Sequence, residues 1–327
     1  MKSVLRAHGN KEVIVVDDGS KNNCRQVLGE FTKQYDNLRC HYFSANQGKR
    51  DALHFAVTKL IGNSRFVVTI DSDTVLDRYA LVNVVRQLKD LNVGAATGDV
   101  QLLNEKQNIL TRMIGSYYWI GLNIYKKAQS SVGMVVCCSG CLAAYRRDVL
   151  DKIINRFVHQ EFLGERCTHS EDRHLTNLVL EKGYRVVYAE DAISYTETPA
   201  TIKGFLKQQQ RWKRGYTRES LYTLTYAWRV KPLLFIQILF WDLTVPYFTL
   251  GFMVALAITI VLNPVFFLTT ILPAWLVFIL VRNAPLIMQS RRKVGGLFLY
   301  LLFYEIFLYW QSIYALFTVR NKSWITR

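Results

Sequence analysis

The chain has 327 residues, half of them hydrophobic, and a formal net charge of +16, a length that suits about two domains. From residue 200 onward there are 15 basic residues against three acids, in the part that also holds the long apolar runs. This combination fits an anionic membrane surface and argues against a nucleic-acid-binding protein, because the apolar runs are too long for a soluble domain. The six cysteines follow neither a disulfide framework nor a zinc-site spacing, which indicates reduced thiols facing the cytosol.

The first predicted strand, Glu12–Asp17, leads into Asp17-Asp18-Gly19-Ser20. Gly19 suits a turn, and Ser20 suits the N-cap of the helix that follows. The residues leave two interpretations open. The carboxylates accept hydrogen bonds from a base or ribose, or they belong to a turn that merely caps a helix.

Lys49 and Arg50 follow Asn46-Gln47-Gly48 and open the next predicted helix, Asp51–Leu60. Two cations at a helix N-terminus oppose the macrodipole, which favours anions there. A bound phosphate removes that conflict by pairing with both side chains and the free N–H groups. The alternative is a solvated pair of surface cations.

The segment Val67–Ile70 predicts a buried parallel strand that ends in Asp71-Ser72-Asp73. In an open α/β sheet, ligands bind outside the carboxyl ends of the strands. A hard divalent cation bound with a nucleotide diphosphate takes one or two carboxylates plus phosphate oxygens, which Asp71 and Asp73 suit. The alternative is a solvated turn, with Asp73 as a helix N-cap.

A small-residue segment, Val135–Cys141, contains Cys138-Ser139-Gly140 and runs into Leu142–Arg147. Small residues let another molecule approach the backbone closely, so this segment is either an acceptor-binding loop or a tight β-bend. The elements before it are predicted as a helix, a strand and a long helix: Asp77–Asp90, Gly94–Leu103 and Asn108–Lys127.

Ser170-Glu171-Asp172-Arg173-His174 precedes an apolar helix, Leu175–Leu180, and a further strand, Tyr184–Ala189. Ser170 suits an N-cap. One of the carboxylates, next to Arg173, suits a general base for a hydroxyl group. His169 and His174 lack the spacing of a zinc site with a third ligand.

Thr201–Arg229 is basic and amphipathic, which predicts a helix lying on the cytosolic face of a membrane. It contains Gln208-Gln209-Gln210-Arg211-Trp212. Arg211 suits a clamp on a diphosphate, and ordinary interfacial anchoring is the alternative for Arg211 and Trp212.

The remaining chain is mostly apolar. Pro246–Leu262 and Pro264–Val281 predict two membrane spans joined by a short turn, with residues 291–293 on the cytosolic side. A third run, Val294–Val319, carries Glu305 and either crosses the membrane or enters and returns. The chain closes on Trp324-Ile325-Thr326-Arg327.

Taken in order, these motifs make the sequence resemble the processive, inverting glycosyltransferases of the hyaluronan synthase, chitin synthase and nodulation N-acetylglucosaminyltransferase group. The resemblance runs from about Ser3 to Arg327. It rests on an ordered set of motifs: Val16–Ser20, Asn46–Arg50, Asp71–Asp73, Cys138–Gly140, Glu171–Arg173, Gln208–Trp212 and Trp324–Arg327.

The resemblance implies a role for each matching position. It implies that Asp172 is the base and that Asp73 binds Mg²⁺ or Mn²⁺. Nucleotide-sugar binding is implied for Asp17, Asp18, Lys49, Asp71, Gln208, Arg211, Trp212, Trp324 and Arg327. Acceptor binding is implied for Cys138, Ser139 and Gly140.

The same resemblance implies an α/β, Rossmann-like GT-A glycosyltransferase domain over residues 1–200. An interfacial helix over 201–232 and a membrane region over 233–327 would follow. The implied reaction is sugar transfer from a UDP-sugar to a growing polysaccharide at the plasma or inner membrane, with the catalytic domain cytosolic. The alternatives are a nodulation-type oligosaccharide synthase, a lipid glycosyltransferase, and a non-enzyme that is an inactive fragment or a nucleotide-sugar sensor.

Three departures from the group stand out. Cys141 stands where relatives often have proline, and Ile325 where synthases usually have glycine. Relatives also have membrane helices and a first strand before the position of Met1. In a doubly wound sheet that strand lies between the strands ending at Asp17 and Asp71. We therefore expect a fragment or a mis-started chain, with the sheet interrupted there.

Overall fold

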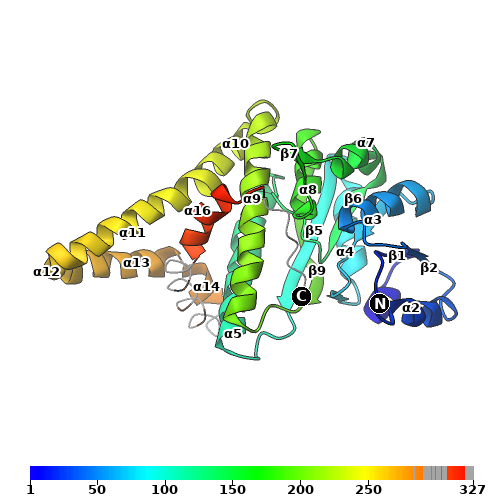
Figure 1. Ribbon diagram of the computed structural model, residues 1–327, viewed down its shortest axis with the longest axis horizontal. Coiled ribbons are helices and arrows are strands. Elements are labelled where there is room, and N and C mark those ends of the chain that lie inside the picture. Colours follow the sequence, from blue (N-terminus) through cyan, green and yellow to red (C-terminus); the bar gives the residue numbers. More distant parts are fainter. Residues whose placement is uncertain (283, 290–295, 297–298, 300–302, 304–307, 321–327) are drawn as a thin grey trace. The chain divides into compact units, whose positions relative to one another are not determined.

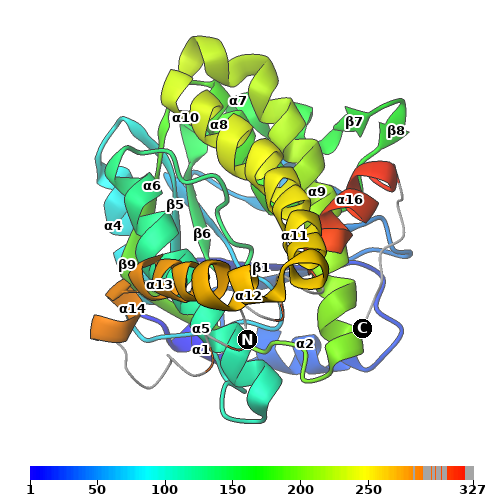
Figure 2. The same cartoon turned by 90° about the vertical axis from the view of Figure 1, so that its left-hand side faces the viewer.

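The computed structural model describes residues 1–282, 284–289, 296, 299, 303 and 308–320. It divides into two compact units (Figures 1 and 2). The sheet unit comprises Met1–Gln101 and Lys126–Thr196, and the helical unit comprises Leu102–Tyr125 and Glu197–Val319.

The main sheet of the sheet unit has five strands in the order β3-β6-β5-β9-β4. β3 and β5 both pair antiparallel with β6, and β4 pairs antiparallel with β9. The strands are β3 (Phe66–Thr69), β4 (Val75–Leu76), β5 (Val93–Leu102), β6 (Ala143–Arg146) and β9 (Arg185–Thr196). The strand before Asp71 was therefore predicted in the right place but with the wrong direction of pairing. The apolar run of β3 predicts burial and carries no information on its partner.

A separate two-stranded sheet joins β1 (Val13–Asp17) and β2 (Leu38–Tyr42) in parallel, with Val13 opposite Leu38 and Asp17 opposite Tyr42. Among the residues that the structure describes, β1 and β3 belong to different sheets. This agrees with the expected interruption between them. A third, small sheet is the hairpin of β7 (Glu161–Phe162) and β8 (Glu165–Arg166).

Helices of the sheet unit cover the sheet, and their apolar faces build the core. Val84 of α4 and Leu142, which precedes β6, are both fully buried in this core. The helical segments are α1 (Lys2–Arg6), α2 (Cys24–Thr32), α3 (Lys49–Phe55), α4 (Ala80–Arg86), α6 (Lys127–Ser131), α7 (Arg147–Val158) and α8 (Glu171–Glu181). A π-helical segment continues α3 over Ala56–Leu60, and a 3-10 helical segment continues α4 over Gln87–Lys89. Ser20 does not cap α2 as predicted, because α2 begins four residues later with Asn23 as its N-cap.

The helical unit is built around α9 (Ile202–Val230), where one helix was predicted over Thr201–Arg229. Thr201 caps it by accepting a hydrogen bond from the Gly204 N–H. Pro232 begins the next helix, in agreement with the preference of proline for a first helical turn. The other segments are α5 (Ile109–Ile120), Gly121–Lys126, α10 (Pro232–Gln237), Ile238–Thr244, α11 (Val245–Leu262), α12 (Pro264–Phe266), Phe267–Ile271, α13 (Leu272–Arg282), α14 (Ala284–Gln289) and α16 (Tyr309–Phe317).

One face of α9 buries charged side chains inside the helical unit. Arg218 and Glu219 form an ion pair of 3.2 Å and are almost completely buried. Arg214 donates to the hydroxyl of Thr318, which directly follows α16, at 3.0 Å. The amphipathic pattern of this helix therefore reflects packing against other helices as well as exposure of side chains such as Trp228.

Two membrane spans were expected at Pro246–Leu262 and Pro264–Val281. Among the helices that the structure describes, none combines the length and the apolar character needed to cross a membrane.

At Gly98, β5 lies so close to β9 that a Cβ there would stand 2.3 Å from the Ala192 carbonyl oxygen. We predict that Gly98→Ala lowers the free energy of unfolding by about 1–3 kcal/mol, the usual cost of overpacking. Urea denaturation measures this. The control is Gly29→Ala in α2, where nothing lies within 4 Å of the added Cβ and helix propensity gains up to about 1 kcal/mol. Equal stability of the two variants would contradict this packing.

Candidate active site

The site begins where the end of β3 meets the start of β6. Because these strands are antiparallel neighbours, Asp71 lies beside the segment that precedes β6. The Asp71 N–H donates to the Gly140 carbonyl at 2.8 Å. A Cβ on Gly140 would stand 2.6 Å from Oδ2 of Asp71. Position 140 therefore needs glycine because a carboxylate occupies the space of its side chain.

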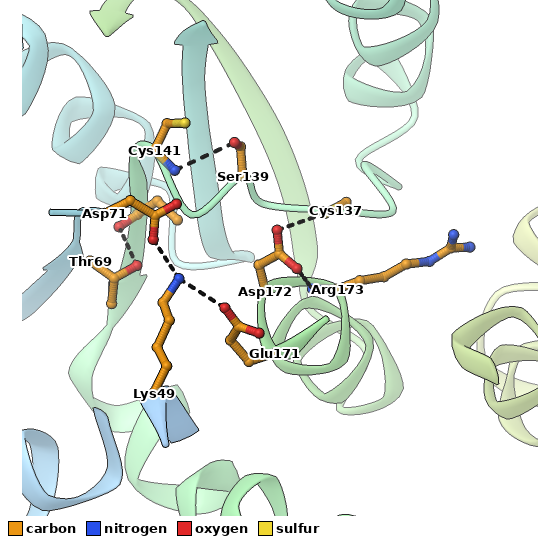
Figure 3. A network of polar contacts seen from close by, with 10 residues as sticks. Lys49, Thr69, Asp71, Cys137, Ser139, Cys141, Glu171, Asp172 and Arg173 are labelled. Atoms are coloured by element: carbon orange, nitrogen blue, oxygen red, sulfur yellow. Dashed lines mark hydrogen bonds and ion pairs between the residues drawn. The ribbon is translucent and has the colours of Figure 1, made fainter. Parts of the chain in front are cut away.

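Lys49, the first residue of α3, reaches this carboxylate (Figure 3). Its amino group forms ion pairs with Asp71 and, at 2.8 Å, with Oε1 of Glu171. The preceding Gly48 has a φ of +99°, a conformation that suits glycine. The Asp18 carboxylate accepts hydrogen bonds from the N–H groups of Gln47 at 2.7 Å and Gly48 at 2.9 Å. Asp18 thus fixes the loop that positions Lys49.

Lys49 and Glu171 each stabilise the ionised form of the other. Burial lowers the pKa of the Lys49 amino group, but the carboxylates of Glu171 and Asp71 outweigh it and leave that pKa raised. Burial raises the pKa of Glu171, but the nearby Lys49 charge outweighs it and leaves that pKa lowered. Both groups are therefore ionised at neutral pH.

Asp172 differs from its neighbour. It lies in the first turn of α8, which follows Ser170 in a left-handed conformation with φ of 60°. Oδ1 of Asp172 accepts from the Arg173 N–H at 2.8 Å, and Oδ2 lies 3.6 Å from the Cys137 thiol. Burial, and then the charge of Glu171, raise the pKa of Asp172. Two adjacent carboxylates whose pKa values are shifted in opposite directions are suited to different roles, Glu171 to that of a countercharge and Asp172 to that of a proton acceptor.

Asp73 lines a pocket of about 840 Å³ together with residues of α1, such as Lys2 and Ser3, and with Thr74–Leu76 and Arg78. Among the described residues, no group of three or more His, Cys, Asp or Glu side chains could hold a metal ion. A pair of carboxylates that relies on phosphate oxygens for the remaining ligands is nevertheless the common arrangement for Mg²⁺. Mg²⁺ also binds through one carboxylate and phosphate oxygens, and Asp73 suits such an incomplete site, whereas the Asp71 carboxylate is already paired with Lys49.

The structure brings together Lys49, Asp71, Gly140 and Asp172, which the sequence predicted separately (Figure 3). Ser139 also belongs here, and its hydroxyl lies 3.5 Å from the Cys141 amide nitrogen. Asp17 instead accepts a hydrogen bond from the Ser20 N–H at 3.3 Å.

Arg50 does not join Lys49 in facing a phosphate, as one interpretation of the sequence expected. It is buried and donates to the Phe157 carbonyl at 2.8 Å and to the Gln160 side chain at 2.6 Å. On a helix, adjacent residues point in different directions, so only Lys49 is directed into the site.

Gln208, Arg211 and Trp212 lie on α9 in the helical unit, each partly exposed. The side-chain oxygen of Gln208 is buried without a hydrogen-bond partner among the described residues, which is unusual in a folded protein. Trp324 and Arg327 lie outside the described residues. The binding roles of these five residues stay predictions.

Sequence reasoning missed Glu171 as the partner of Lys49. It also missed Cys137 and Thr176, which contact Asp172. The adjacent carboxylates of Glu171 and Asp172 were visible as a pair, but nothing in their spacing linked one of them to a lysine more than 100 positions earlier.

Comparison with known proteins gives one family match and several similar proteins. Residues 1–215 match the family described as glycosyltransferase-like family 2. The chain is 37% identical over 227 residues to an N-acetylglucosaminyltransferase of Bradyrhizobium diazoefficiens, covering 68% of this chain and 45% of that protein. It is 34% identical over 285 residues to hyaluronan synthase 3 of Xenopus laevis, covering 85% of this chain and 50% of that protein. The chain thus spans about half the length of these curated relatives.

Among solved structures, a mannosyltransferase from Pyrobaculum calidifontis in complex with GDP-Man and Mn²⁺ is similar with a TM-score of 0.67. The similarity covers 97% of this chain and 81% of that chain at 18% sequence identity. At this identity it establishes a common fold.

We predict that Gly140→Ala destabilises the sheet unit by about 1–3 kcal/mol, because the new Cβ displaces the Asp71 carboxylate from Lys49. A double-mutant cycle with Asp71→Ala, measured by urea denaturation, isolates this clash. Once the carboxylate is absent, the cost of Gly140→Ala should fall by about 1 kcal/mol or more. An unchanged cost would show that the clash lies elsewhere.

The raised pKa of Asp172 makes the free energy of unfolding depend on pH. A carboxyl group whose pKa is higher in the folded than in the unfolded state lowers the free energy of unfolding as the pH rises from its unfolded pKa to its folded pKa. The full cost is present above the folded pKa, and there is no cost below the unfolded pKa. Asp172→Asn should therefore increase the free energy of unfolding by roughly 1 kcal/mol at pH 7.5. The gain should vanish near pH 4, about the unfolded pKa of an aspartate. A gain of equal size at both pH values would contradict the shift.

Proposed function

The chain belongs to glycosyltransferase-like family 2 and has a GT-A-like fold, and from this premise we propose that it lengthens a polysaccharide. In this proposal the sugar comes from UDP-N-acetylglucosamine, alone or together with UDP-glucuronate. It passes to the hydroxyl group of a growing chain with inversion at the anomeric carbon. The names of the relatives, N-acetylglucosaminyltransferase and hyaluronan synthase, support these substrates.

The observation that carries the proposal is the pair of carboxylates at the start of α8. Asp172 has a raised pKa and is held by two hydrogen bonds, whereas Glu171 is paired with Lys49. An inverting transfer in one displacement needs a single base to accept the proton of the attacking hydroxyl. Asp172 is the carboxylate of the pair that is suited to this role.

The departing nucleoside diphosphate needs positive charge, because electrostatic stabilisation is usually the largest catalytic term. Lys49 supplies one charge, and Asp71 and Glu171 hold its amino group in place. Asp73 would hold Mg²⁺ or Mn²⁺. When bound, such an ion neutralises charge on the diphosphate. The proposal also assigns nucleotide-sugar binding to Gln208, Arg211, Trp212, Trp324 and Arg327.

We also place the protein at the plasma or inner membrane, with the sheet unit in the cytosol. In support, α11 and α13 expose large apolar side chains, including Phe252, Ile258, Leu262, Val277 and Phe278. Exposed apolar surface of this extent is typical of a surface that contacts lipid or another protein. A lipid bilayer is the partner that the proposal assigns to these helices.

A second candidate is the synthesis of a short oligosaccharide, as the nodulation-type relatives suggest. The N-acetylglucosaminyltransferase match at 37% identity is the observation that favours it. The two candidates share the sugar donor and the base. They differ in product length, which size-exclusion chromatography of a radiolabelled product separates.

The proposal predicts that Asp172→Asn reduces sugar transfer at least about 10³-fold, because a general base and the charge of its carboxylate are lost together. UDP release by membranes carrying the full chain measures transfer, with each UDP-sugar alone and then with both. UDP affinity, measured by calorimetry, should remain within about twofold, because Asp172 is not assigned to the nucleotide.

The matched control is Asp151→Asn, which removes a half-exposed aspartate on α7 that pairs with Arg147. It should leave transfer unchanged. Transfer by Asp172→Asn near the parental rate would remove Asp172 from the base role. UDP binding without release from any UDP-sugar would favour a nucleotide-sugar sensor.

A further inference from the structure

We propose that Cys137 is a positioning residue for Asp172: its thiol donates a hydrogen bond that orients the carboxylate and limits its basicity. This inference rests on the proposed function of Asp172 as the base. It adds a residue that neither the motifs nor the relatives assign, and it gives the thiol a role that needs no nucleophilic chemistry.

The contact is specific to one carboxylate oxygen (Figure 3). Sγ of Cys137 lies 3.6 Å from Oδ2 of Asp172, while Oδ1 accepts from the Arg173 N–H at 2.8 Å. Cys137 is only 9% exposed, so water does not compete freely for the thiol. Two donors, one on each oxygen, fix the plane of the carboxylate and leave its remaining lone pairs for a substrate hydroxyl.

The backbone holds this thiol in place. The Cys138 N–H donates to the hydroxyl of Thr176 at 2.8 Å, and that hydroxyl donates to the Asp172 carbonyl at 2.7 Å. Cys138 and Thr176 are completely buried. These two hydrogen bonds link Cys138, the residue next to Cys137, to the turn of α8 that carries Asp172.

The thiol is suited to donate. Burial, and then the charge of Asp172, raise the pKa of Cys137 well above its ordinary value, so the sulfur keeps its proton at neutral pH. A hydrogen bond to an ionised carboxylate stabilises the ionised form. It therefore opposes burial and the charge of Glu171, both of which raise the pKa of Asp172. Because S–H is a weak donor, the opposition is partial and the carboxylate remains a competent base.

Other charged or titratable groups also act on this pair, and each stays in place in the variants below. They are Glu171 and Arg173 on α8, Lys49 on α3, Asp71 after β3, Tyr145 on β6, and Lys126 and Cys138 in the chain before β6. A change confined to the Cys137 side chain therefore isolates the contribution of the thiol.

The test is the pH dependence of kcat for sugar transfer by the full chain. Cys137→Ala removes a donor to the ionised carboxylate, so the acid limb of the profile should move to higher pH by about 0.5 unit or more. One pKa unit corresponds to about 1.4 kcal/mol. On the acid side of the limb, where kcat follows the ionised fraction of the base, a shift of about 0.5 unit should lower kcat about 3-fold. KM for the UDP-sugar should stay unchanged. A merely structural loss would lower kcat at every pH and leave the limb where it was.

Cys137→Ser retains a donor, and its acid limb should lie closer to that of the parent than the limb of Cys137→Ala does. Cys137→Val fills the volume of the thiol without a donor, and it replaces the alanine variant if that variant does not fold. Cys40→Ala, in β2, removes a thiol outside the site and should leave activity unchanged.

The outcomes distinguish the role of Asp172 as the base from the role of Cys137 as its positioning residue. If Asp172→Asn keeps its activity, the base assignment fails and this inference fails with it. If Asp172→Asn is inactive but Cys137→Ala and Cys137→Val keep the parental limb, only the inference is overturned. It is overturned as well if the serine and alanine variants shift the limb equally, because shape and not the donor would then be the cause.

Discussion

The amino group of Lys49, held between the carboxylates of Asp71 and Glu171, is the interaction on which the rest of the site depends. It joins three segments that are distant in sequence: the start of α3, the end of β3 and the start of α8. Neither carboxylate would be favourable in this partly buried place without a countercharge. A single cation thus allows acidic side chains to gather where the proposed nucleotide-sugar substrate would also need positive charge.

The same ion pair explains why two neighbouring carboxylates behave differently. Glu171 is neutralised by contact, and Asp172 receives hydrogen bonds but no contact with Lys49. A proton acceptor needs a raised pKa and a fixed orientation, and these have separate causes here. Burial and the charge of Glu171 raise the pKa of Asp172. The backbone of α8 and the segment before β6 fix the orientation of its carboxylate.

Much of this arrangement follows from the sequence, and the exceptions have physical causes. The strands before Asp17 and Asp71 and the long helix α9 were predicted within two residues of their ends, because apolar runs and caps mark them locally. The partner strand of β3 was not predictable, since pairing depends on long-range contacts that a hydrophobic run does not encode.

The same contrast holds for the site. Asp71 and the pair Glu171-Asp172 could be singled out because they stand at the ends of apolar segments, whereas the choice of Asp172 as the base follows from the family resemblance and stays a prediction. Two further roles appear only when distant loops come together: Asp18 as the anchor of the loop before Lys49, and Cys137 beside Asp172.

The left-handed backbone of Ser170 has a consequence for how this sequence can vary. A non-glycine residue with φ of 60° is uncommon, and only small polar residues and glycine tolerate it well. A β-branched side chain at this position would favour a different φ and rotate the first turn of α8. The direction of the Asp172 carboxylate is therefore set partly by a residue that does not touch it. Position 170 should accept glycine or asparagine during evolutionary drift and reject valine or isoleucine, although its side chain takes no part in the chemistry.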